Sequence, residues 1–175
     1  MLKHPIKTAA LLLSILVYLP ACGVLTATPT GGVRNPSRAS GEDAEYSFRQ
    51  EVIGYAQKLL GTKYRAGGKD PRGFDCSGFT GYVMKNFDVK LSASSRYQAQ
   101  EGRKVDLKDV KPGDLIFFKR SPRGEIFHVA MVVNNSKAGI EVIHSTSRGV
   151  VIDNISKSAY WEPKIYSARD VLSRR

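Results

Sequence analysis

The sequence of 175 residues lacks the features that define several classes of protein. Its two cysteines are too few for a disulfide framework or a four-cysteine zinc site. No internal repeat of solenoid period is present. The main apolar run, Ala9–Leu19, is too short to span a bilayer comfortably as a helix, which excludes a multi-pass membrane protein. Acidic side chains are scarce, because 16 Asp and Glu stand against 27 Lys and Arg, and the net formal charge is +11.

What the sequence does contain suits one folded domain with additional segments. Apolar residues make up 42% of the chain, which is too many for a wholly disordered protein. Residues 1–21 have the pattern of a secretory signal, because a basic start with Lys3 and Lys7 precedes the apolar run. That run ends in Leu19-Pro20-Ala21-Cys22-Gly23, which resembles the bacterial lipobox. The resemblance implies cleavage before Cys22 and lipid on its sulfur; an ordinary signal peptide and an uncleaved anchor are the alternatives.

The position of the mature protein follows from this segment. Gly23 rather than Asp follows the cysteine, and by resemblance to proteobacterial lipoproteins we expect an outer-membrane anchor that faces the periplasm. Residues 22–45 are rich in Gly, Pro, Ser and Thr and predict a lipidated cysteine followed by a flexible linker, with a reach on the order of 25 Å. The folded domain is then expected over 46–175.

The charge of the mature chain indicates its partners. Loss of residues 1–21 removes two lysines and no acid, which leaves a net formal charge of +9. Such a protein favours anionic partners, which here are wall polymers and lipid surfaces. Because the signal directs export, nucleic acid is not an expected partner, and we expect a monomer. A generally cationic surface without a dedicated site explains the charge equally well.

The pattern within the domain changes from helical to extended. Apolar spacing predicts a helix over Phe48–Leu60, and a second over Cys76–Phe87 with Asp75 as its N-cap. A short helix is expected over Ser94–Gln100. Five strands are predicted after these helices: Asp114–Lys119, Ile126–Val133, Ile140–His144, Gly149–Asp153 and Lys164–Ala168. Helices followed by an antiparallel sheet of five to six strands give an α+β class.

Cys76 is the first candidate for chemistry. If Cys22 carries lipid, Cys76 is an unpaired thiol in an oxidising compartment, where such a thiol is a hazard unless it is buried or used. Its predicted place in the first turn of a helix favours the thiolate, because unpaired N–H groups gather there, although Asp75 opposes this effect. Gly78 and Gly81 suggest a close backbone approach. A buried structural cysteine is the alternative.

Two histidines lie on the strands of one predicted hairpin. With a five-residue turn over 134–138, His128 faces His144 directly on one inward face. Each alone could be a hydrogen-bonded core residue. Together with the lone thiol, they supply a nucleophile, a base and a group that orients the base. The same three residues could bind zinc, but no short-spaced ligand pair supports that, and we expect neither a metal ion nor a cofactor.

Several motifs in chain order resemble the NlpC family, the papain-like cysteine peptidases of the bacterial cell wall. They are Gly61–Gly68, Phe74-Asp75-Cys76-Ser77-Gly78-Phe79, Arg96–Gln100, Lys111–Leu115, His128–Val132, Ile143-His144-Ser145 and Ala159-Tyr160-Trp161. The resemblance implies a papain-like fold, with N-terminal helices on a central antiparallel sheet. It also implies roles for individual residues: Cys76 as nucleophile, His128 as general base, His144 as third member, Tyr64 as oxyanion donor, and Asp75 and Ser77 in the substrate cleft.

The implied activity is hydrolysis of peptidoglycan stem peptides through an acyl-enzyme. The bond is left open between the cross-link of two stem peptides and the γ-D-glutamyl–diaminopimelate bond. Two alternatives remain: a non-catalytic envelope lipoprotein that binds the wall through the same groove, and an amidase or acyltransferase on the same fold.

Overall fold

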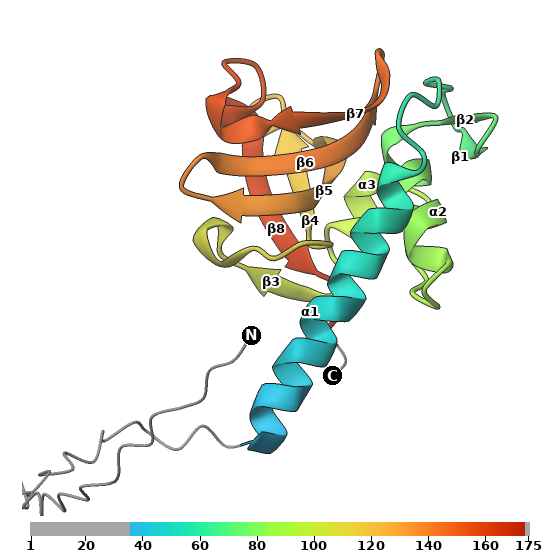
Figure 1. Ribbon diagram of the computed structural model, residues 1–175. Helices are drawn as coiled ribbons and strands as arrows, with labels where there is room; N and C mark the ends of the chain where they lie inside the picture. Colours follow the sequence, from blue (N-terminus) through green and yellow to red (C-terminus); the bar gives the residue numbers. More distant parts are fainter. Residues whose placement is uncertain (1–35, 174–175) are drawn as a thin grey trace, which may run out of the picture. The chain divides into compact units, whose positions relative to one another are not determined.

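The computed structural model describes residues 36–173 of the chain (Figure 1). The expected signal over 1–21, Cys22 and the first part of the expected linker lie outside these residues. Over the described part, the elements in chain order are α1 (Pro36–Gln57), β1 (Lys69–Asp70), β2 (Gly73–Phe74), α2 (Cys76–Lys85), α3 (Ser95–Gln98), β3 (Arg103–Val105), η1 (Leu107–Asp109), β4 (Leu115–Lys119), β5 (Ile126–Ser136), β6 (Gly139–Thr146), β7 (Gly149–Asn154), η2 (Ile155–Lys157), η3 (Glu162–Lys164) and β8 (Ile165–Asp170). None of the described helices combines the length and the apolar character needed to cross a membrane.

Six strands form the main sheet, in the order β3-β8-β4-β5-β6-β7, and every neighbouring pair is antiparallel. Helices α1, α2 and α3 lie on one side of this sheet (Figure 1). The α+β class with N-terminal helices and an antiparallel sheet is therefore confirmed. The sequence analysis missed the edge strand β3, which has three residues and only one buried side chain, because so short an edge carries no clear alternation.

Helix α1 differs from its prediction at both ends. It begins at Pro36 rather than Phe48, so residues 36–45, assigned to the linker, are helical. This part has no apolar stripe to signal a helix, although proline suits a first helical position. At the other end, α1 stops at Gln57, and tight i→i−3 turns lead to Gly61, whose positive φ of 79° ends the segment.

Both faces of the sheet are buried, and alternate residues of each strand serve the two cores. One core packs the sheet on α1 and α2 and contains Phe117, Val129, Met131 and Ile143. The other core, on the opposite face, contains Phe118, Ala130, Val132 and Val142, with Trp161 packed against it. Period-two alternation shows that side chains point to one face or the other, but it does not say which face meets the helices. His128 and His144 alternate in step with Ala130 and Val142, so both point to the face of the second core.

The β5–β6 hairpin has a different register from the predicted one. Its turn consists of two residues, Lys137 and Ala138, and a bulge occurs between Val132 and Asn134. Beyond the bulge Val132 pairs with Val142 and Met131 with Ile143, so the predicted direct pairing of His128 with His144 is wrong. The error is a shift of two residues. Because an even shift leaves every side chain on its face, the two histidines still share one face of the sheet.

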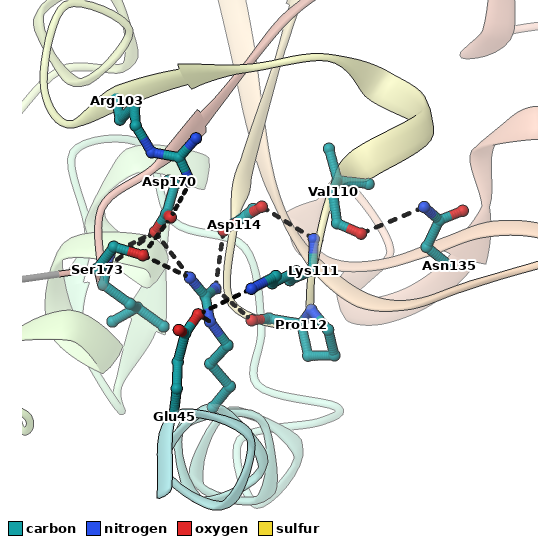
Figure 2. Close-up of polar contacts among 11 residues, drawn as sticks. Glu45, Arg103, Val110, Lys111, Pro112, Asp114, Asn135, Asp170 and Ser173 are labelled. Atoms are coloured by element: carbon teal, nitrogen blue, oxygen red, sulfur yellow. Dashed lines mark hydrogen bonds and ion pairs between the residues drawn. The ribbon is translucent and has the colours of Figure 1, made fainter. Parts of the chain in front are cut away.

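A buried charge cluster joins α1 to the sheet (Figure 2). The Arg49 guanidinium of α1 contacts Asp114 at 2.8 Å and Asp170 at 2.9 Å, and donates to the carbonyl of Pro112 at 2.9 Å. Arg49 and both carboxylates are almost fully buried. Asp114 precedes β4 and Asp170 ends β8, so one side chain connects the helix to two neighbouring strands.

Candidate active site

The start of α2 is held by Asp75, as predicted. Its Oδ1 accepts the backbone N–H of Gly78 at 2.6 Å and the Ser77 hydroxyl at 3.1 Å, which makes Cys76 the first residue of the helix. Gly78 allows this helix start to approach the preceding loop, because a Cβ there would lie 1.9 Å from the carbonyl oxygen of Gly68. The predicted close approach is confirmed at Gly78. At Gly81 the nearest atom would be 3.9 Å away, an ordinary contact.

The Cys76 sulfur lies beside strand β5. The β5–β6 pairs end at Met131 and Ile143, and the backbone N–H of Val129, beyond that last pair, points at the sulfur. Burial raises the pKa of the Cys76 thiol, Asp75 raises it further, and the N–H groups of Val129 and Ser77 partly oppose them. The predicted preference for thiolate at the helix start is thus outweighed by burial, and the resting sulfur is a thiol.

The two histidines contact each other although they are not directly opposed. His128 Nε2 lies 3.0 Å from His144 Nδ1, and this leaves Nδ1 of His128 as its remaining ring nitrogen. Burial lowers the pKa of His128 to about 3, with the neighbouring His144 adding to the effect. Burial also lowers the pKa of His144, against the opposing effect of Asp153. Both rings are therefore uncharged at neutral pH.

Two further residues support the rings, and sequence reasoning gave neither a role. The indole of Trp161 stacks on His128 with ring centroids 4.7 Å apart. Asp153 Oδ2 lies 3.0 Å from Nε2 of His144 and also contacts Arg148. Trp161 stands in a motif that carried the family resemblance. Asp153 ends a predicted strand, and only the pairing of that strand with β6 shows that it reaches His144.

These groups open onto a cleft of about 840 Å³. Tyr64, Cys76 and His128 all line it, and Cys76 is partly exposed there. Its wall also carries the cationic side chains Arg120, Arg148 and Lys157. The sulfur is therefore not sealed away, and a peptide has a route to it.

The other predicted site residues have distinct positions. Burial and the nearby Cys76 and Asp75 raise the pKa of the Tyr64 hydroxyl, so it stays protonated and can donate a hydrogen bond. Ser77 is buried and donates to Asp75 and to the carbonyl of Ala93 at 3.1 Å. The residues that line the cleft include neither Asp75 nor Ser77, and their contact with substrate stays a prediction. Within residues 36–173 no group of three or more His, Cys, Asp or Glu side chains could hold a metal ion.

Known proteins are similar to this chain over the same folded domain. Residues 61–170 match the NlpC/P60 family. The Gamma-DL-glutamyl hydrolase of Bacillus subtilis (strain 168) is 36% identical over 143 residues, 79% of this chain and 34% of that protein. The Probable endopeptidase NlpC of Escherichia coli (strain K12) is 37% identical over 117 residues, 66% of this chain and 73% of that protein. The crystal structure of an NlpC/P60 family protein from Bacillus cereus has a TM-score of 0.66 and 30% identity, covering 71% of this chain and 40% of that chain.

Proposed function

The chain belongs to the NlpC/P60 family, and from this we propose that it is a cysteine endopeptidase that hydrolyses peptidoglycan stem peptides. The observation that carries the proposal is the single cleft that both Cys76 and His128 line, with His144 hydrogen-bonded to His128 at 3.0 Å. A thiol, a base and a group that orients the base are the parts that acyl transfer requires.

In the proposed reaction, the Cys76 thiol attacks the carbonyl carbon of an amide bond. As the sulfur–carbon bond forms, the thiol proton passes to Nδ1 of His128, which then protonates the leaving amine as the carbon–nitrogen bond breaks. The Tyr64 hydroxyl and the backbone N–H of Cys76 stabilise the oxyanion. Water then attacks the thioester, gives its proton to His128, and releases the acid and the free thiol.

The charge of the cleft supports this substrate class. Arg120, Arg148 and Lys157 line it, and the carboxylate of Asp153, on the same wall, is already paired with Arg148. Stem peptides carry free carboxylates, which cationic side chains attract. The similarity to the Gamma-DL-glutamyl hydrolase of Bacillus subtilis favours the γ-D-glutamyl–diaminopimelate bond. The alternative bond is the cross-link between two stem peptides.

The test is digestion of purified muropeptides by the protein and by the Cys76→Ala variant. We expect hydrolysis products from the first and none from the second. Cys22→Ser, which removes the other cysteine, is the control and keeps the activity. The masses of the products show which of the two peptide bonds is cut, and they distinguish both from an amidase reaction, which would release a peptide without sugar. Equal product patterns for the protein and Cys76→Ala would contradict the proposal and leave a binding role.

We also propose that the chain is a lipoprotein with residues 1–21 removed, lipid on Cys22, and a tether to the periplasmic face of the outer membrane. The basic start, the short apolar run and Leu19-Pro20-Ala21-Cys22-Gly23 support it. Several acyl chains give firm attachment at about 0.8 kcal/mol per buried CH₂. Radiolabelled palmitate should be incorporated by the full chain and not by Cys22→Ser. Equal labelling of both proteins would contradict the proposal.

A further inference from the structure

The carboxylate of Asp153 ends a continuous line of hydrogen bonds that begins at the His128 ring. His128 Nε2 and His144 Nδ1 are 3.0 Å apart, and His144 Nε2 and Asp153 Oδ2 are also 3.0 Å apart. The three side chains come from β5, β6 and β7, three neighbouring strands of the sheet. His144 is completely buried, so the hydrogen bonds of its two nitrogens are those that the neighbouring side chains offer.

The chemistry of a carboxylate determines where each proton in this line lies. An ionised carboxylate can only accept hydrogen bonds, so Nε2 of His144 carries the proton that it donates to Asp153. An uncharged imidazole has a single N–H, and Nδ1 of His144 is therefore an acceptor. It accepts from Nε2 of His128, which places the only proton of that ring on Nε2. Nδ1 of His128 is left with a free electron pair.

We propose that Asp153 is a positioning residue that sets the tautomer of both histidines and so leaves Nδ1 of His128 free to take the thiol proton. The effect of Asp153 on catalysis rests on the proposed function, whereas the tautomers that it sets do not. With the opposite tautomers Nδ1 of His128 would carry a proton and could not act as a base. Asp153 touches neither the thiol nor the reacting carbonyl, and acts through His144.

The charge of Asp153 has a second effect during the reaction. When His128 receives the thiol proton it becomes a cation and donates from Nε2 to His144, whose other nitrogen donates to the carboxylate. The negative charge at the end of this line stabilises the buried imidazolium. Bonds from His144 and Arg148 outweigh burial and lower the pKa of Asp153, so the carboxylate stays ionised. The charged groups that act on the His144 ring are Asp153 and Arg148, and the wall of the cleft that His128 lines also carries Arg120 and Lys157.

A purely structural role for Asp153, joining the end of β7 to β6, makes different predictions. It would change stability without changing the place of a proton on either ring. The first measurement therefore uses the unaltered protein with ¹⁵N-labelled histidine, and reads each tautomer from the nitrogen shifts and couplings at pH 7. We expect both His128 and His144 to be Nε2–H tautomers. A proton on Nδ1 of either ring would overturn the proposal.

The second measurement uses Asp153→Ala and Asp153→Asn. We expect kcat on stem peptides to fall by about 100-fold with KM changed less than threefold, the order of loss for an outer carboxylate that orients a histidine. In both variants, the nitrogen signals should show a mixture of tautomers. Glu141→Gln is the matched control, because Glu141 lies on the same strand as His144 but its carboxylate accepts a hydrogen bond from Asn134 and not from a histidine. This variant should leave kcat and both tautomers unchanged.

The outcomes separate the two proposals. If the unaltered protein does not cleave stem peptides but both rings are Nε2–H and become mixed in Asp153→Ala, the proposed function fails and the positioning role stands. If the protein cleaves stem peptides and Asp153→Ala keeps the tautomers and kcat of the unaltered protein, the positioning role fails and the proposed function stands. Melting temperatures identify a variant that has not folded, and the measurement on the unaltered protein still decides.

Discussion

Replacing Arg49 by alanine is expected to remove much of the stability of the domain. The change leaves the carboxylates of Asp114 and Asp170, which are 1% and 2% exposed, without the guanidinium that lies 2.8 and 2.9 Å from them (Figure 2). Burial already raises the pKa of Asp114 even with Arg49 present. Breaking a buried ion pair by removing one partner costs about 3–5 kcal/mol, because the remaining charge is unpaired in a medium of low dielectric.

The structure offers a close control for this magnitude. Arg103 contacts the other oxygen of Asp170 at 2.9 Å, but its side chain is 66% exposed. An exposed pair contributes about 0–1 kcal/mol, so Arg103→Ala should cost less than 1 kcal/mol. Both variants remove an arginine from Asp170, but Arg49 is buried and also contacts Asp114, whereas Arg103 is exposed.

The assay is urea unfolding at pH 7, followed by far-ultraviolet circular dichroism, for the protein and each variant. The free energy of unfolding of a domain is about 5–15 kcal/mol, so a loss of about 3–5 kcal/mol is readily measured. The double variant Arg49→Ala, Asp114→Asn should be more stable than Arg49→Ala alone, because it removes one unpaired charge. If Arg49→Ala costs no more than Arg103→Ala, the reasoning from burial is refuted.

Three further predictions concern the site and its supports. Tyr64→Phe should lower kcat on stem peptides by about 100-fold with little change in KM, because it removes one oxyanion donor; steady-state kinetics that show an unchanged kcat would remove Tyr64 from the mechanism. Gly78→Ala should lower the free energy of unfolding in urea by about 3 kcal/mol, because its Cβ would overlap a backbone carbonyl oxygen at 1.9 Å. Gly81→Ala in the same helix should raise that free energy by up to about 1 kcal/mol. Similar values for the two variants would contradict the overlap. Because burial holds the pKa of His128 and His144 below 6.5, the unfolded chain binds more protons than the folded one as the pH falls from 7 to 5. With a folded pKa of about 3, His128 alone should cost about 2 kcal/mol of stability over this range, and His128→Asn should lose less between the two pH values. A stability that rises toward pH 5 would show that the folded state does not exclude these protons.

Local sequence patterns predicted two features of the site, the helix start at Cys76 and the shared face of the two histidines, because each depends on neighbouring residues. The N-cap at Asp75 depends only on residues next to it, so the place of Cys76 at a helix start could be predicted. The meeting of His128 with His144 survived a wrong register, because the error was even and a strand alternates with period two. The start of α1 was wrong because its first residues have no apolar face that a sequence pattern could reveal.

The sequence by itself therefore determined the α+β class, the residue types that could form a nucleophile and its base, and the face of the hairpin that the two rings share, since each depends on local spacing. Only the tertiary structure decided how burial acts on these groups, because desolvation depends on every element packed around them. It alone brought Asp153 behind His144, through the pairing of β7 with β6. It also placed the Cys76 sulfur at the point where the pairing of β5 with β6 has ended, a contact between segments far apart in the chain that no periodicity encodes.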